Sequence, residues 1–89
     1  MIEEIYDMEM YKKYIQQVAK IVENYHGEYL ARSNKVLPFM GAKPERAIVI
    51  AFDSVEEAQG CFFSEEYEKI KHLREDSTQA RAFFIENDG

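Results

Sequence analysis

Three arginines and two tyrosines carry the binding chemistry that this sequence offers. Arg32, Arg46 and Arg74 each bear a planar guanidinium group, which binds a carboxylate or an enolate through paired N–H donors. Tyr14 and Tyr67 add hydroxyl groups that donate hydrogen bonds. We predict that Arg32, Arg46, Tyr14 and Tyr67 bind a small ligand in a partly apolar cleft.

Ordinary structural roles are the alternative for these residues. Arginines at strand ends commonly pair with carboxylates, here Asp53 or Glu57, or point into water. Tyrosines at helical spacing usually pack in a core with the hydroxyl group at its rim. The tyrosines to which this applies are Tyr11, Tyr14, Tyr25, Tyr29 and Tyr67.

The other reactive side chains are two histidines and one cysteine. His72 is the candidate general base, since free imidazole titrates near pH ~6.5. A position on the protein surface would explain the presence of this histidine equally well. No nucleophilic side chain is spaced in the sequence to act with it. Otherwise the catalytic residues are unassigned. Cys61 lies beside two phenylalanines and is expected to be a buried, inert thiol. These three residues do not make a metal-ligand set, and we expect no metal and no cofactor.

Composition and charge exclude several classes of protein. The 89 residues predict one domain, 1–89, and 46% hydrophobic residues are too many for a disordered chain. Lys and Arg number 11 against 17 Asp and Glu, and this net charge of −6 disfavours binding to nucleic acid or to an anionic membrane. A single cysteine and an acidic N-terminal segment indicate a cytoplasmic protein.

Helices are predicted where capping residues precede apolar stripes. Asp7 is the expected N-cap of a long helix, and Gly27 is the expected left-handed residue after its end. Ser54 caps a short second helix. Ser64 restarts that helix as a second N-cap, and the segment ends near Glu75.

Strands are predicted from alternating and continuous apolar runs. They cover Glu28–Arg32, Arg46–Phe52 and Arg81–Glu86, with a short strand around Ile2 and Ile5 and a turn at Ser77–Ala80. Strict alternation places Arg32 on the same face as Leu30. The Ser33–Glu45 segment is expected to be a long loop.

The predicted order is βαββαβ, an α+β fold of the ferredoxin-like kind, in which two helices cover one face of an antiparallel sheet. The other face of the central strand carries Ala47, Val49 and Ala51. Because no predicted element covers this apolar face, we expect the chain to form a homodimer through it.

Several segments resemble the domain-of-unknown-function 1330 family. They are Tyr25–Arg32, Gly41, Pro44–Arg46, Ile48–Ser54, Phe62–Tyr67 and Leu73–Arg74, with Tyr11 and Tyr14 after Asp7. The resemblance implies a ferredoxin-like fold and a dimeric α+β barrel, and it implies no particular reaction. Members usually carry Gly-Gly where this chain has His26-Gly27.

Three functions are therefore open at the level of sequence. The first is a homodimeric protein that binds a small apolar or anionic molecule between helices and sheet. The second, which the resemblance implies, is a cofactor-independent enzyme of the oxygenase or isomerase type. The third is a scaffold or interaction protein without a ligand, in which side chains of the protein itself fill the cleft.

Overall fold

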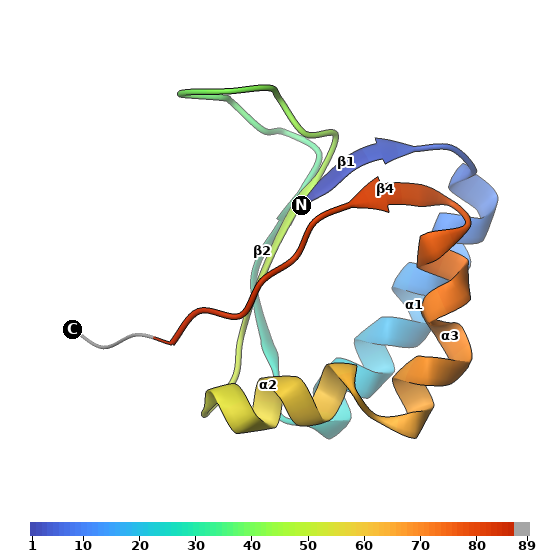
Figure 1. Cartoon of the computed structure of the whole chain (residues 1–89), viewed down its shortest axis with the longest axis vertical. Helices are drawn as coiled ribbons and strands as arrows, with labels where there is room; N and C mark the ends of the chain where they lie inside the picture. The colour runs from blue at the N-terminus through green and yellow to red at the C-terminus, as the bar shows by residue number, and fades with distance from the viewer. Residues whose placement is uncertain (87–89) are drawn as a thin grey trace.

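The computed structural model describes residues 1–86, and the last three residues of the predicted 1–89 domain lie outside the described part. The fold is mixed α/β, with three helices and two small antiparallel sheets (Figure 1). The elements are β1 (Ile2–Ile5), α1 (Met8–Asn24), β2 (Glu28–Ser33), β3 (Ala47–Ala51), α2 (Val55–Phe62), α3 (Glu65–Glu75) and β4 (Thr78–Ala80). Among the described helices, none has both the length and the apolar character needed to cross a membrane.

Helix α1 begins where the sequence predicts. The Asp7 side chain accepts a hydrogen bond from the backbone N–H of Met10 at 3.1 Å, and this satisfies a donor that the helix itself leaves free. The apolar stripe of α1 is buried as expected. Its buried members are Tyr11, Tyr14, Val18, Ile21 and Val22.

The end of α1 corrects one prediction. The left-handed residue is His26, with φ 62°, and not Gly27. The N–H groups of His26 and Gly27 donate to the carbonyls of Glu23 and Val22 at 3.0 and 2.9 Å, which closes the helix. Gly27 is needed for space instead, because a Cβ atom there would lie 2.6 Å from Val22 and 2.7 Å from the Phe52 ring.

The two serine caps of the second helical region are confirmed. Ser54 Oγ accepts from the N–H of Glu57, and Ser64 Oγ accepts from the N–H of Tyr67, both at 3.1 Å. The break at Phe63 and Ser64 separates α2 from α3, and α2 lies along the lower edge of the molecule in Figure 1.

Strands β2 and β3 form an antiparallel hairpin with a register irregularity between Tyr29 and Ala31. Tyr29 pairs with Ile50, and Arg32 pairs with Ile48. Since opposed residues share a sheet face, the irregularity puts Tyr29 and Arg32 together on the helix side. The expectation that Arg32 shares a face with Leu30 is therefore wrong.

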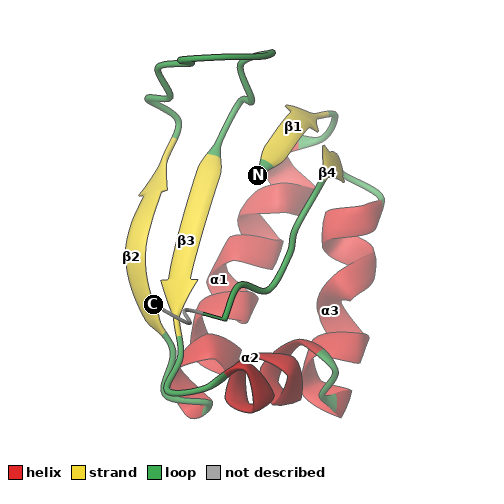
Figure 2. Cartoon of the chain, turned by 60° about the vertical axis from the view of Figure 1, so that its left-hand side comes forward, coloured by secondary structure: helices red, strands yellow, loops and turns green. Residues whose placement is uncertain are grey.

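The last predicted strand is also wrong. Strand β4 is Thr78–Ala80, within the predicted turn, and residues 81–86 form no strand (Figure 2). The Thr78 hydroxyl donates to the carbonyl of Arg74 at 2.7 Å, which lets the chain leave α3 and enter a strand at once. Ala80 pairs with Ile2, and Arg81 exchanges backbone hydrogen bonds with Met1. Strand β1 is therefore paired with Thr78–Ala80, in place of the predicted strand Arg81–Glu86.

Within residues 1–86, an isolated bridge links the two sheets. Ile2 pairs with Arg46, just before β3, and the Ile2 N–H donates to the Arg46 carbonyl at 2.8 Å. The bridge holds the start of β3 beside β1, and so it fixes the backbone position from which the Arg46 side chain extends.

Candidate functional site

A chain of hydrogen bonds connects α1 and α3. The hydroxyl groups of Tyr14 and Tyr67 lie 2.8 Å apart and are buried, and Arg74 Nε donates to the Tyr67 oxygen at 3.1 Å. The cap at Ser64 sets the phase of α3, so that Tyr67 and Arg74, two turns apart, lie on the same helix face. Burial raises the pKa of Tyr14, and the neighbouring Tyr67 adds to the shift. Tyr14 therefore remains neutral at physiological pH.

Arg46 lies between the sheet and α1. Its Nη1 donates to Asn34 Oδ1 at 2.9 Å, whereas its Nε is buried and has no hydrogen-bond partner among residues 1–86. Burial raises the pKa of Tyr11, and the nearby Arg46 guanidinium opposes that shift. A buried donor without a partner costs free energy, so Arg46 is a position where an incoming acceptor would be stabilised.

Arg32 lies over the ring of Tyr29, with Cζ 4.5 Å from the ring centre, an attractive cation–π geometry. Its side chain is exposed, and both residues line a groove between β2 and α1. Burial raises the pKa of Tyr29, while Arg32 and then Arg46 act against it. Tyr29 is therefore influenced by both arginines, and Arg32 contacts its ring directly.

Pairing with carboxylates, one of the alternative roles considered for these arginines, is not observed within residues 1–86. Within residues 1–86, ion pairs with N···O distances up to 4.0 Å are formed by Lys71 with Glu68 and by Arg81 with Glu3. None of Arg32, Arg46 and Arg74 belongs to such a pair in this part of the chain. In a protein of net charge −6, three arginines without carboxylate partners leave cationic groups available to an external anion.

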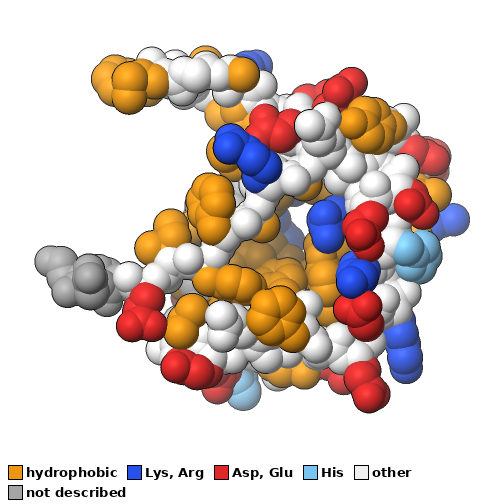
Figure 3. Space-filling view, in the orientation of Figure 1, with side chains coloured by type: hydrophobic (Ala, Val, Ile, Leu, Met, Phe, Trp, Pro, Cys, Tyr) orange, Lys and Arg blue, Asp and Glu red, His pale blue; other side chains and the backbone are white. Residues whose placement is uncertain are grey.

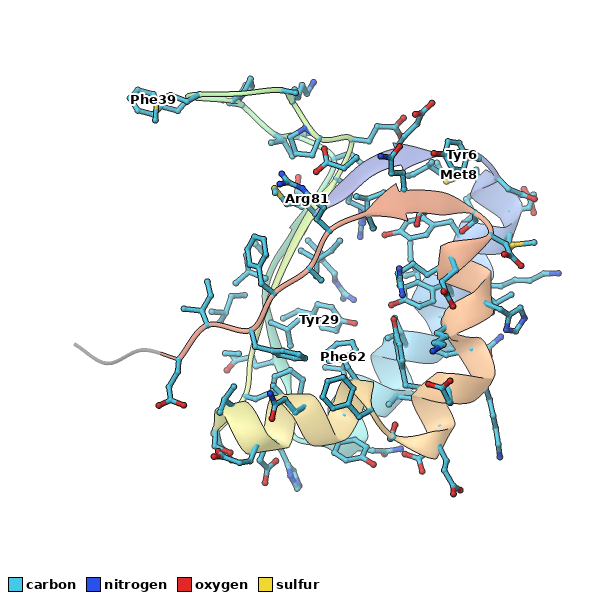
Figure 4. All side chains as sticks on the ribbon, viewed as in Figure 1. Tyr6, Met8, Tyr29, Phe39, Phe62 and Arg81 are labelled. Atoms are coloured by element: carbon cyan, nitrogen blue, oxygen red, sulfur yellow. The ribbon has the colours of Figure 1, made fainter. Side chains whose placement is uncertain are left out.

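Aromatic rings surround the same region. Figure 3 shows a hollow at the centre of this face, lined largely by hydrophobic side chains, with basic side chains along its α3 side. Figure 4 shows Tyr29 pointing into the hollow from β2 and Phe62 from α2. The Phe62 ring centre is 5.1 Å from that of Tyr67 and 6.3 Å from that of Phe84. The hollow thus combines apolar walls with tyrosine and arginine donors.

The structure therefore brings together most of the predicted site residues. Tyr14, Tyr67 and Arg46 lie with Arg74 between helices and sheet, and Arg32 lies beside them on Tyr29. Phe84 is a contributor that sequence reasoning missed, because its segment was assigned to a strand. The sequence feature that could have indicated its role is the adjacent pair of aromatic residues, Phe83 and Phe84.

The candidate general base and the predicted inert thiol lie elsewhere. His72 is exposed on α3, whereas Cys61 is fully buried, and burial, assisted by Glu66, raises the pKa of its thiol to about 11. Within residues 1–86, no group of three or more His, Cys, Asp or Glu side chains is placed to hold a metal ion.

Comparison with known proteins places the chain in a family. The model described as "Domain of unknown function (DUF1330)" matches residues 1–88. No curated protein matches the sequence. Because the family model covers almost the whole chain, with Tyr14, Tyr67 and the three arginines inside it, this protein belongs to the DUF1330 family.

Proposed function

We propose that the protein is a homodimer that binds a small anion with an apolar or aromatic body in the hollow between β2–β3 and the helices. The observation that carries this proposal is the set of arginines without carboxylate partners within residues 1–86. Arg46, with its buried Nε, is the strongest member of the set. A carboxylate is the anion that best fits a planar guanidinium.

Each part of the site has a role in this binding. Arg46 Nε donates to the anion, and Arg74, already oriented by its bond to Tyr67, presents its terminal N–H groups. Tyr29 and Phe62 provide aromatic surface for the body of the ligand. Arg32 supplies positive charge at the solvent side of Tyr29.

The homodimer and the finer fold belong to the same proposal. The Ile2–Arg46 bridge supports a continuous ferredoxin-like sheet in the order β4–β1–β3–β2, as in the dimeric α+β barrel proteins. On the outer face of that sheet, Val49 is 51% and Leu30 62% exposed. The face of Ala47, Val49 and Ala51 is where we place the second copy, and the single thiol is consistent with a cytoplasmic setting.

Binding without chemistry explains the site better than catalysis does. A general base needs a pKa near the working pH, yet burial holds Tyr14 far from ionisation, and His72 is exposed on α3. A scaffold without a ligand explains the satisfied Tyr14–Tyr67 pair, but it leaves the buried Arg46 Nε without a function. The enzyme and scaffold alternatives therefore rank second.

Native mass spectrometry of the protein purified from cells is the first test. We expect twice the mass of the chain plus a constant small addition that acid denaturation releases. Titration calorimetry with aromatic and aliphatic carboxylates then identifies the ligand class.

Arg46→Gln and Arg74→Gln should each weaken binding by about 10-fold to 100-fold, as expected for loss of a charged hydrogen bond. Arg81→Gln is the matched control, because Arg81 is paired with Glu3 outside the hollow. Equal affinity of the wild type and the Arg46→Gln variant would refute the proposed site.

A further inference from the structure

The connection between β2 and β3 forms an arm that stands away from the body of the protein. This arm, residues 34–45, extends beyond the strands in both views (Figures 1 and 2). Phe39 lies at its tip, far from the other labelled side chains (Figure 4). Leu37 is 94% exposed, Phe39 95% and Met40 83%. Three large apolar side chains thus lie close together in the sequence and are almost fully exposed to water. Such a cluster is unusual on a protein surface.

The base of the arm is fixed, so its direction is part of the fold. On one side, Arg46 Nη1 donates to Asn34 Oδ1 at 2.9 Å. On the other, the Glu45 N–H donates to the Ile2 carbonyl at 2.9 Å, next to the buried Pro44. Gly41 adopts φ 85°, which few other residues tolerate, and this conformation reverses the chain near the tip. These contacts hold the apolar tip outward.

Charge separates the arm from the remainder of the chain. The arm contains two lysines, Lys35 and Lys43, and one glutamate, Glu45, for a net charge of +1. Since the whole chain has a net charge of −6, the remainder carries −7. An arm with an apolar tip and flanking lysines is thus complementary to the acidic body of another copy of the same protein.

Apolar surface for such an arm is present on the same molecule. Phe83 and Ile85, which follow β4 in the chain, are 67% and 81% exposed. The arm has about six residues that lead to its tip and about six that return. At the usual rise of an extended chain, six residues span ~20 Å. That reach takes its tip well beyond its own hairpin.

We propose that the arm packs against a second copy of this chain, where Leu37, Phe39 and Met40 are buried. In a two-fold dimer both copies donate an arm, so that each arm covers apolar surface on the other subunit. The contact differs from the sheet face of Ala47, Val49 and Ala51, and it does not depend on the ligand.

Sedimentation analysis over a wide range of protein concentration tests the arm. The wild type is compared with a Leu37→Ser, Phe39→Ser, Met40→Ser variant. Its changes lie at exposed positions and should leave the fold intact, which circular dichroism checks. The dissociation constant of the dimer should rise by on the order of 100-fold or more, given the apolar area involved. Met8→Ser, an exposed methionine on α1, is the matched control and should have no effect.

Two results overturn the proposal. One is an arm variant with the same dimer dissociation constant as the wild type. The other is a wild type that stays monomeric at every concentration. In that second case, binding of the wild type to phosphatidylglycerol vesicles, lost in the arm variant, would assign the arm to a membrane surface. Val49→Glu tests the sheet face separately, so failure of one contact is distinguishable from failure of the other.

A labelling experiment gives an independent readout. Cys61 is fully buried, so a maleimide added to a Phe39→Cys variant reports on the arm tip alone. The labelling rate should fall as protein concentration rises through the dimer dissociation constant. A rate that does not change with concentration would contradict burial of the tip in a second copy.

Discussion

The hydroxyl groups of Tyr14 and Tyr67 lie 2.8 Å apart, in a buried hydrogen bond that joins α1 to α3. Their rings meet edge to face, with centres 6.2 Å apart, a favourable aromatic geometry. Arg74 donates to the same Tyr67 oxygen. One phenolic oxygen thus couples helix packing to the orientation of an arginine in the proposed site.

Removing that oxygen should cost stability. Tyr67→Phe leaves the Tyr14 hydroxyl group and the Arg74 Nε without their partner, and we expect a loss of about 1–2 kcal/mol in the free energy of unfolding. Urea denaturation measures it. Tyr6→Phe is the control, since Tyr6 is 60% exposed and bonded only to Gln79, and its change should stay within about 0.5 kcal/mol. Similar losses in both variants would mean that the buried bond adds no net stability.

Alkaline pH should unfold the protein through its buried tyrosines. Burial raises the pKa of Tyr14 and Tyr11 above the ordinary value of 10.0. A raised folded-state pKa gives stability that is complete below the unfolded-state pKa and is lost as pH rises above it. The free energy of unfolding should therefore fall above pH 10, by up to about 1.4 kcal/mol per pH unit for a tyrosine that stays protonated in the folded protein.

Denaturation at several pH values measures this slope, and Tyr14→Phe should make it shallower. Phenolate absorbance gives the second check, because Tyr14 should ionise only as the chain unfolds. If all six tyrosines titrated together near pH 10 in the folded protein, the burial of Tyr14 would be contradicted.

Cys61 should resist thiol reagents. It is fully buried, and burial raises its pKa to about 11 from an ordinary 9.0. Because the thiolate is the reactive form, the higher pKa alone slows reaction on the order of 100-fold relative to the denatured chain. A disulfide reagent with and without urea measures the two rates, and rapid reaction in the folded state would show the thiol to be accessible.

The end of α1 offers a pair of adjacent substitutions with opposite effects. His26 is exposed and has φ 62°, so His26→Gly should stabilise the protein by about 1 kcal/mol through relief of left-handed strain. Gly27→Ala should destabilise it by about 1–3 kcal/mol, since the new methyl group meets Val22 and Phe52. Thermal unfolding compares both variants with the wild type, and equal signs for the two changes would contradict this assignment.

Local signals were sufficient for the helices. Asp7, Ser54 and Ser64 each accept a hydrogen bond from a backbone N–H three residues later, so their information lies within one helical turn. The helical repeat that follows each cap also explains why the apolar stripe of α1 is buried and why Tyr67 and Arg74 lie on the same face of α3. Tyr14 and Tyr67 were therefore predictable as neighbours of a region between helices and sheet.

Pairing partners distant in sequence account for the errors. Residues 81–86 have strand composition, but β1 pairs with Thr78–Ala80 instead. The prediction of the sheet face of Arg32 from strict alternation was wrong because a register irregularity after Tyr29 moves the following side chains of β2 to the opposite face. Neither event leaves a mark in the local pattern of side chains.

The pairing of β1 with β4 also constrains how the protein is made. The hydrogen bonds between Ile2–Ile5 and Thr78–Ala80 join segments more than 70 residues apart, whereas the β2–β3 hairpin and α1 need only near neighbours in sequence. During synthesis on the ribosome, β1 must wait for β4 to emerge, with its backbone groups exposed in the meantime. The pairing of β1 with β4 can therefore form only after Thr78–Ala80 has left the ribosome, and until then the order of the nascent chain depends on α1 and the hairpin.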